Sequence, residues 1–243
     1  MADSPNIVLD APLNRKVLMA VELIDPISLA LVSSGVSVSA QGLKRKPLIN
    51  LSGRFVWLEE DAAWPTQITV NSTDGRFANQ TVPAPPKPPD LDEATAAERL
   101  ARVTLSPSAA YEFGSGITAV RGCLRKDGTK NSPPVPGMRV QLAWLNEDTH
   151  AWVQQSSGAV LTDVDGEFAT WARPQPPAGQ RADIKNGLLA VRLEFTRGGV
   201  TLVTPTTFPF MTGGTTQPPT GRILEGETLG NDLQVNLTQL GKP

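Results

Sequence analysis

The side chains that could act as nucleophile and base are few in this sequence and lie far apart along it. Cys123 is the single cysteine and His150 the single histidine, so these residue types could build one thiol–imidazole pair. Cys123 stands between Gly122 and Leu124 in a run that predicts a β-strand, where a buried structural thiol is the commoner role. No nucleophile elbow and no glycine-rich phosphate loop is present. We therefore expect no catalytic residue, no cofactor and no enzymatic activity.

An acidic tetrapeptide, Asp163-Val164-Asp165-Gly166, has the spacing of the start of a calcium-binding loop. A complete loop needs further oxygen ligands at set positions and a distal bidentate glutamate. In this sequence Glu167 comes too early, and Phe168 interrupts the run of ligands. Asp and Gly also favour tight turns, because Asp hydrogen-bonds its own backbone and Gly tolerates positive φ. The tetrapeptide therefore predicts a turn between two strands, and we expect no metal site.

The acidic run Glu59-Glu60-Asp61 lies between Trp57 and Trp64, and an acid pair beside aromatic rings is a feature of carbohydrate sites. Neighbouring residues of a strand point to opposite faces, however, so Glu59 and Glu60 cannot both line one cleft. We expect Trp57 in the core. The basic run Lys44-Arg45-Lys46 predicts a solvated turn rather than a ligand site.

Composition limits the remaining function classes. The 243-residue chain is 40% apolar and 19% charged, which is typical of a folded protein, and its 21 glycines and 22 prolines favour short strands joined by turns. A net charge of -2 argues against nucleic acid as a partner, and one cysteine excludes an internal disulfide. The first residues lack a signal-peptide pattern, and no apolar stretch is long enough to span a bilayer. We therefore expect the chain to fold in a cytoplasm and not to insert into a membrane.

Alternating apolar residues predict β-strands along most of the chain. Val17, Met19, Val21 and Leu23 alternate with other residues, so they can face one side of a sheet. A single segment favours another structure. Asp92 to Val103 is rich in Ala, Glu, Arg and Leu and predicts a short helix.

Two turn–strand segments carry a family resemblance. The first reads Val135-Pro136-Gly137-Met138-Arg139-Val140-Gln141-Leu142, and the second reads Thr162-Asp163-Val164-Asp165-Gly166-Glu167-Phe168. Together they resemble the carboxypeptidase regulatory-like (transthyretin-like) β-sandwich, and this resemblance implies a sandwich in the second half of the chain. In the expected register Phe168 and Trp144 face the core, whereas Arg139 and Gln141 face outward.

The proline-rich run from Pro83 to Pro89 predicts a domain boundary, because proline cannot donate to a β-ladder and such runs form semi-rigid spacers. The expected fold is all-β, with two Ig-like or transthyretin-like β-sandwich domains joined by a Pro-rich linker and one short helix after the linker. Its expected parts are an extended N-terminal arm (1–15), a small β-sandwich domain (16–82), the linker with its helix (83–103) and a larger carboxypeptidase regulatory-like domain (104–243).

A faint internal repeat favours two sandwiches of related design. Gly53-Arg54-Phe55-Val56-Trp57 corresponds to Gly166-Glu167-Phe168-Ala169-Thr170-Trp171 in the second half. Upstream, Gly35-Val36-Ser37-Val38 corresponds to Gly137-Met138-Arg139-Val140. The alternative is chance, because short turn–strand patterns recur in many β proteins.

The preferred hypothesis for the function is a non-catalytic structural component of a large assembly. Ala20-Val21-Glu22-Leu23-Ile24-Asp25-Pro26 and Ser52-Gly53-Arg54-Phe55-Val56-Trp57-Leu58 resemble accessory proteins of contractile phage tails and related injection systems. This resemblance implies a virion or particle component that is present in multiple copies, has other protein subunits as partners and carries no cofactor. A carbohydrate- or surface-binding module is the first alternative, and an enzyme is the last.

The N-terminal arm carries the residues that we expect to bind a partner. Ile7, Val8, Leu9 and Leu13 form an apolar run on a segment with little periodicity. An extended arm buries too little of its own apolar surface to offset the entropy lost on ordering, so another chain must supply the contact. We therefore predict that these four residues bind a neighbouring subunit.

Overall fold

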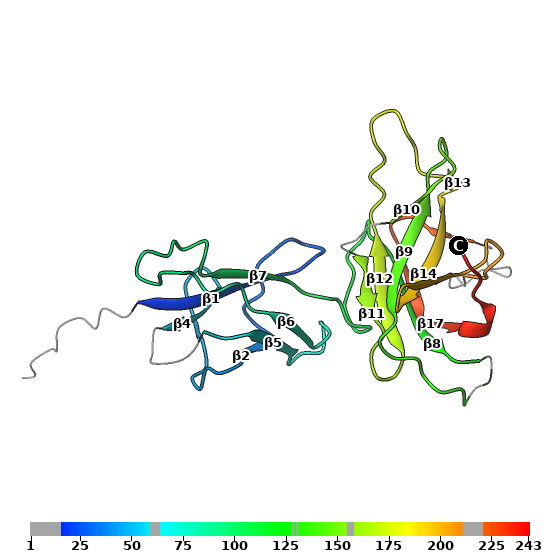
Figure 1. The fold of residues 1–243 in the computed structure, drawn as a ribbon. Coiled ribbons are helices and arrows are strands. Elements are labelled where there is room, and N and C mark those ends of the chain that lie inside the picture. Colours follow the sequence, from blue (N-terminus) through cyan, green and yellow to red (C-terminus); the bar gives the residue numbers. More distant parts are fainter. Residues whose placement is uncertain (1–15, 59–63, 128, 130, 155–157, 211–220) are drawn as a thin grey trace, which may run out of the picture.

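The computed structural model describes residues 16–58, 64–127, 129, 131–154, 158–210 and 221–243, without the side chains of 230–232. Within these ranges the chain is all-β and folds into two β-sandwiches that follow one another along the sequence (Figure 1). The described residues include no α-helix, and therefore no helix with the length and apolar content to cross a bilayer.

The first sandwich consists of a sheet with strand order β3-β4-β1-β7 and a sheet with order β2-β5-β6. The alternation predicted for its first strand is confirmed for Met19, Val21 and Leu23, which are fully buried between the two sheets. It was wrong for Val17, which is exposed, because the register shifts between Val17 and Met19. Its strands are β1 (Val17–Ile24), β2 (Val36–Ala40), β3 (Leu48–Ile49), β4 (Phe55–Leu58), β5 (Gln67–Ser72), β6 (Gln80–Pro83) and β7 (Leu100–Thr104).

The second sandwich packs the sheet β12-β8-β17 against a larger sheet around β9 and β14. Phe168 and Trp144 lie in its core as predicted, and the Phe168 ring meets the Phe195 ring edge-on at a centroid distance of 5.7 Å. Its strands are β8 (Thr118–Arg125), β9 (Arg139–Leu145), β10 (Trp152–Gln154), β11 (Val160–Leu161), β12 (Glu167–Ala172), β13 (Ile184–Lys185), β14 (Leu188–Arg197), β15 (Val200–Val203), β16 (Arg222–Leu224) and β17 (Thr228–Asn236).

The two sandwiches share one strand pattern, which confirms the repeat at the level of topology. In each, the first strand lies between an antiparallel neighbour and the last strand of the sandwich, which runs parallel to it. Val21 of β1 is paired with Phe55 of β4, and Gly122 of β8 is paired with Phe168 of β12. Both phenylalanines are buried in their cores. Phe55 and Phe168 therefore mark equivalent positions.

The tryptophans of the repeat are not equivalent. Trp57 is buried in the core of the first sandwich, and its indole nitrogen donates to the carbonyl oxygen of Arg45 at 3.1 Å. Trp171 instead belongs to a small separate cluster on the outer side of its sheet, with Ile117 and Ala119. Aligned on the phenylalanines, the two tryptophans differ by one position, and one position along a strand exchanges its two faces.

The helix expected at Asp92–Val103 was wrong. The end of this segment forms β7, which pairs in parallel with β1 and buries Ala101 and Val103. The segment has the composition of a helix, but its apolar side chains are mostly alanine and give a helix little to pack. The open edge of β1 offers backbone hydrogen bonds, and pairing with it also buries the two inward side chains.

The proline-rich run is part of the first sandwich and is not a linker between the two. Pro83 ends β6, and the Trp64 indole nitrogen donates to the carbonyl oxygen of Pro85 at 2.8 Å. Ala84 and Leu91 pack against the first core. Proline cannot donate to a ladder, but it can accept a hydrogen bond and cover apolar surface, which is its role in this segment.

One side chain of β9 also differs from expectation. Arg139 is exposed as predicted, but Gln141 is buried. Gln141 is paired with Glu194 of β14, whose carboxylate accepts hydrogen bonds from Gln154 and Arg192. These polar side chains cover the outer face of the sheet. The Gln141 side chain therefore points outward, as predicted, but its neighbours shield it from solvent.

Candidate functional site

The outer face of sheet β4-β1-β7 carries a buried carboxylate between two arginines. The Arg54 Nε donates to Glu22 Oε1 at 2.7 Å, and the Arg102 Nε donates to Glu22 Oε2 at 3.0 Å. Glu22 is only 5% exposed. The Arg54 hydrogen bond, opposed by burial and aided by Arg102, holds the pKa of the Glu22 carboxyl below its ordinary value. Glu22 is therefore a fixed anion that joins three strands.

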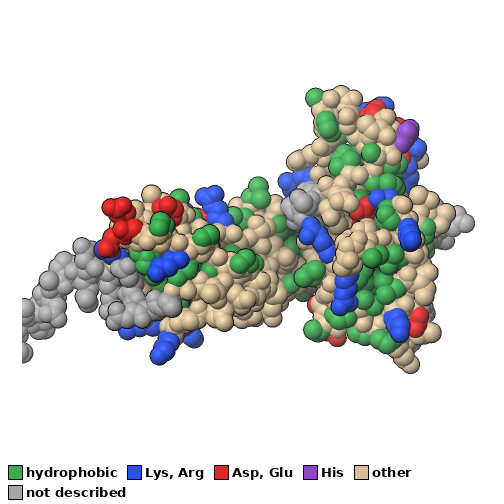
Figure 2. Space-filling model, viewed as in Figure 1, with side chains coloured by type: hydrophobic (Ala, Val, Ile, Leu, Met, Phe, Trp, Pro, Cys, Tyr) green, Lys and Arg blue, Asp and Glu red, His purple; other side chains and the backbone are tan. Residues whose placement is uncertain are grey.

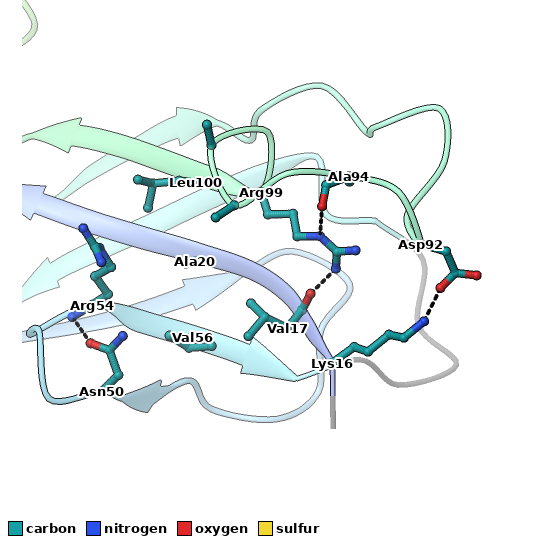
Figure 3. A pocket seen from close by; sticks show the side chains of 12 residues that line it. Lys16, Val17, Ala20, Asn50, Arg54, Val56, Asp92, Ala94, Arg99 and Leu100 are labelled. Atoms are coloured by element: carbon teal, nitrogen blue, oxygen red, sulfur yellow. Dashed lines mark hydrogen bonds and ion pairs between the residues drawn. The ribbon is translucent and has the colours of Figure 1, made fainter. Parts of the chain in front are cut away.

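A groove of about 700 Å³ lies beside this cluster on the same face of the first sandwich (Figure 3). Its floor is one cross-strand row: Ala20 of β1 is paired with Val56 of β4 on one side and with Leu100 of β7 on the other. The segment that leads into β7 forms one wall with Ala94, Ala96 and Ala97, and Asn50 stands on the opposite side. The groove therefore has an apolar floor.

Charged side chains stand around the rim of the groove and are engaged with one another or with the backbone. The Lys16 ammonium pairs with the Asp92 carboxylate, and the Arg99 guanidinium donates to the carbonyl oxygens of Val17 and Ala94 (Figure 3). Arg54, which also lines the groove, is held by Glu22. An anion site presents several hydrogen-bond donors that point to one position, and the charged side chains of this rim do not. It fits an apolar ligand with a polar outer side.

The equivalent face of the second sandwich is covered by the first sandwich and the segment that connects them. Arg121 stands at the position that corresponds to Ala20, and it donates to the carbonyl oxygen of Tyr111. Its guanidinium lies over the Phe113 ring, 5.7 Å from the centroid. Beside it, Ile27 and Phe113 pack against the Trp171 cluster. One outer face is thus occupied within the chain, while its counterpart carries the groove.

Cys123 and His150 are not brought together. Cys123 lies half-buried on the outer side of β8, where its thiol contacts the carbonyl oxygen of Asp165 at 3.2 Å. Burial raises the pKa of this thiol, so the thiolate is disfavoured. His150 is exposed in the turn between β9 and β10 of the other sheet, with φ of 53° (purple in Figure 2). The pair cannot act as nucleophile and base in this arrangement.

The acidic tetrapeptide forms a turn between strands, as predicted. The Asp163 carboxylate accepts the backbone N–H groups of Asp165 at 2.9 Å and Glu167 at 2.8 Å. Gly166 has φ of 75°, and a Cβ at this position would lie 2.5 Å from the carbonyl oxygen of Leu124, so only glycine fits. The described residues contain no group of three or more His, Cys, Asp or Glu that could hold a metal ion.

Other residues singled out in the sequence have simple placements or none. Lys44, Arg45 and Lys46 are exposed in the turn after β2. Glu59-Glu60-Asp61 lies outside the described residues, as do the four arm residues Ile7, Val8, Leu9 and Leu13. The groove was not found from the sequence, because its floor joins Ala20, Val56 and Leu100, which are remote in sequence and share no motif.

No protein-family model and no curated protein sequence matches the chain. Solved structures with distant similarity include a streptococcal ancillary pilin, at 10% identity over 93% of this chain and 63% of that one, with a TM-score of 0.25. A shaft pilin SpaA mutant from Lactobacillus rhamnosus GG shows 7% identity over 90% and 97% of the two chains, with a TM-score of 0.22. A 9R-lipoxygenase from Cyanothece PCC8801 shows 16% identity over 49% and 16%, with a TM-score of 0.27.

The chain thus spans less than two thirds of the lipoxygenase and of the ancillary pilin. Similarity at these scores carries no inference about the family, partner or activity of the chain.

Proposed function

We propose that the chain is a non-catalytic structural subunit of a large protein assembly, with other subunits of the particle as its partners. The observation that carries this proposal is the difference between the two outer faces. In the second sandwich, Ile27 and Phe113 cover the face beside Ala119. The equivalent face of the first sandwich holds an apolar-floored groove around Ala20. A surface that forms an interface in one repeat is a natural interface in the other.

The edge of the first sandwich supports the same proposal. Leu48 and Ile49 of the short edge strand β3 are 59% and 54% exposed, and Leu51 in the following turn is fully exposed. Asn50, in the same turn, lines the groove. Exposed apolar side chains that gather at a sheet edge are typical of interaction surfaces. Asn50 thus connects this edge to the groove, and the two are the candidate contact surfaces of the first sandwich.

For the particle, we propose an accessory component of a contractile phage tail or a related injection system, present in several copies. The support is the sequence resemblance of residues 20–26 and 52–58. In the structure these segments include most of β1, with Glu22, and all of β4, which Arg54 directly precedes at the candidate surface. We further propose that the chain folds in the host cytoplasm before it joins the particle.

Co-sedimentation with the native particle tests this function. A chain that lacks residues 2–12 should retain the melting temperature of both sandwiches, because the described strands of both lie between Val17 and Asn236. It should nevertheless sediment with the particle less well than the full-length chain, because the apolar arm residues are removed. A chain with residues 2–12 replaced by a Gly-Ser sequence of equal length controls for length alone. Equal incorporation of all three chains would refute the assembly role of the arm.

A further inference from the structure

The groove of the first sandwich has a counterpart that shows what kind of segment can cover it. In the second sandwich, the leader that precedes β8 lies over the outer face, where Ala109 and Ala110 line a small pocket with Arg121. The carbonyl oxygen of Tyr111 accepts from Arg121. The cover is therefore a leader segment with small or apolar side chains, and Ala109 and Ala110 form a turn within it. It contacts the residue that is equivalent to Ala20.

The register of the repeat identifies the corresponding residues in the first half. Ala110 precedes Arg121 by the same number of positions as Leu9 precedes Ala20. Leu9 belongs to the apolar run that begins at Ile7, and the chain returns to the groove at Lys16, whose side chain lines it. The segment with the right composition is thus the N-terminal one.

The route that the leader takes in the second half is less favourable for the N-terminal segment on its own sandwich. There the leader reverses direction before β8 through Gly116, which has φ of 83° and donates its N–H to the carbonyl oxygen of Gly226 at 2.9 Å. The equivalent position before β1 is occupied by Arg15. A residue with a Cβ adopts such a φ less readily than glycine, so this route is less favourable in the first half of the chain.

We propose that the segment Ile7 to Leu13 of one copy of this chain docks in the groove of a second copy. Apolar side chains of the segment meet the floor formed by Val56, Ala20 and Leu100. This inference rests on the proposed function, and it names the receiving surface and the partner.

Thiol cross-linking between full-length chains tests the docking. The native cysteine is first removed by Cys123→Ala, and single thiols are then introduced by Leu9→Cys in one chain and Ala97→Cys in another. Ala97 is exposed on the groove wall. When the two chains are mixed and oxidised, we expect a disulfide-linked dimer that joins the two introduced thiols, identified by mass spectrometry after digestion. The matched control replaces Ala97→Cys with Ser39→Cys, on an exposed position of β2 in the opposite sheet.

A blocked groove should abolish the cross-link. Ala20→Arg places in the groove the side chain that the second repeat carries at Arg121, and Ala97→Arg blocks the wall in a second way. Because Ala97 is changed in one of these chains, Lys16→Cys at the edge of the groove supplies the reporting thiol in both. Each blocked chain should form disulfide-linked dimers with the Leu9→Cys chain only at the level of the Ser39→Cys control. Unchanged melting temperatures establish that the blocked chains are folded.

The possible outcomes separate this proposal from the proposed function. A yield equal to that of the Ser39 control, or a cross-link that forms only within a single chain carrying both thiols, overturns docking between copies. If the chain lacking residues 2–12 still incorporates poorly into the particle in that case, the assembly function stands and only the groove assignment fails. Failure of the full-length chain to sediment with the particle would remove the assembly function itself.

Discussion

Glu22 and Cys123 occupy equivalent positions in the two sandwiches. Each points outward from the first strand of its sandwich, one residue beyond the position that is paired with the buried phenylalanine. Each is also paired in parallel with the last strand, Glu22 with Arg102 and Cys123 with Gln234. The same backbone position thus carries a charged cluster in one repeat and a half-buried thiol in the other. Because the surroundings differ, the two positions should respond differently to substitution and pH.

The core of the second sandwich should depend strongly on Phe168. Phe168→Ala leaves a cavity beside Phe195 that the surrounding sheets can fill only in part, so it should cost about 3–5 kcal/mol of unfolding free energy. Urea denaturation followed by tryptophan fluorescence measures the change. Val164→Ala, at a position that is 79% exposed in the neighbouring turn, is the control and should have little effect. A Phe168→Ala chain as stable as wild type would contradict the observed packing.

Glu22 should make the stability of the first sandwich depend on pH. Its folded-state pKa is lowered, so its contribution is fully present above its ordinary pKa of 4.5 and is lost as the pH falls through the lower folded value. Glu22→Gln should cost about 1–3 kcal/mol near neutral pH, because charge-assisted hydrogen bonds to Arg54 and Arg102 are lost. The difference between the two chains should shrink in acid.

The measurement for Glu22 is the urea midpoint of both chains from neutral pH down into the acid range. Glu93→Gln, in an exposed turn of the same sandwich, changes the same side-chain type and serves as the control. A constant difference between Glu22→Gln and wild type at every pH would show that the carboxylate charge of Glu22 is not what stabilises the sheet.

The buried hydrogen bond between Tyr111 and Asp25 should anchor the segment that leads to the second sandwich. The Tyr111 hydroxyl donates to Asp25 Oδ2 at 2.7 Å, and both residues are buried. Tyr111→Phe removes the hydroxyl donor and leaves the buried Asp25 carboxylate without this hydrogen bond. The change should lower the free energy of unfolding by about 1.5–3 kcal/mol. Burial, followed by the bond to Asp25, raises the pKa of Tyr111, so the phenol should ionise only when alkali unfolds the chain. Ultraviolet absorbance compared with circular dichroism along an alkaline titration tests this, and ionisation before unfolding would contradict it.

Cys123 and His150 should be dispensable. Cys123→Ala and His150→Ala should leave incorporation into the particle unchanged, because the two side chains lie on different sheets. The Cys123 thiol should also react with iodoacetamide more slowly in the folded chain than in urea, since its raised pKa lowers the thiolate fraction. Loss of function in a folded Cys123→Ala or His150→Ala chain would instead favour an enzymatic role.

Local patterns were sufficient for most of the strands. The burial of Met19, Val21 and Leu23 follows directly from the two-residue period of a strand, and the turn at Asp163 to Gly166 follows from side-chain hydrogen bonding and positive φ. Both are properties of consecutive residues, so the sequence alone predicts them. The same holds for Phe168 in the core, because it points to the opposite face from its exposed neighbour Glu167.

The sequence by itself determined an all-β chain with two related sandwiches. The tertiary structure decided which strands pair with β1 and β8. Both pair in parallel with the last strand of their sandwich, and such pairs lack the tight turn that marks a hairpin in the sequence. For this reason β7 was mistaken for a helix: its residues become a strand only because β1 has an open edge. The groove at Ala20 was hidden for the same reason, since its floor comes from three strands whose contact depends on long-range pairing rather than on any local pattern.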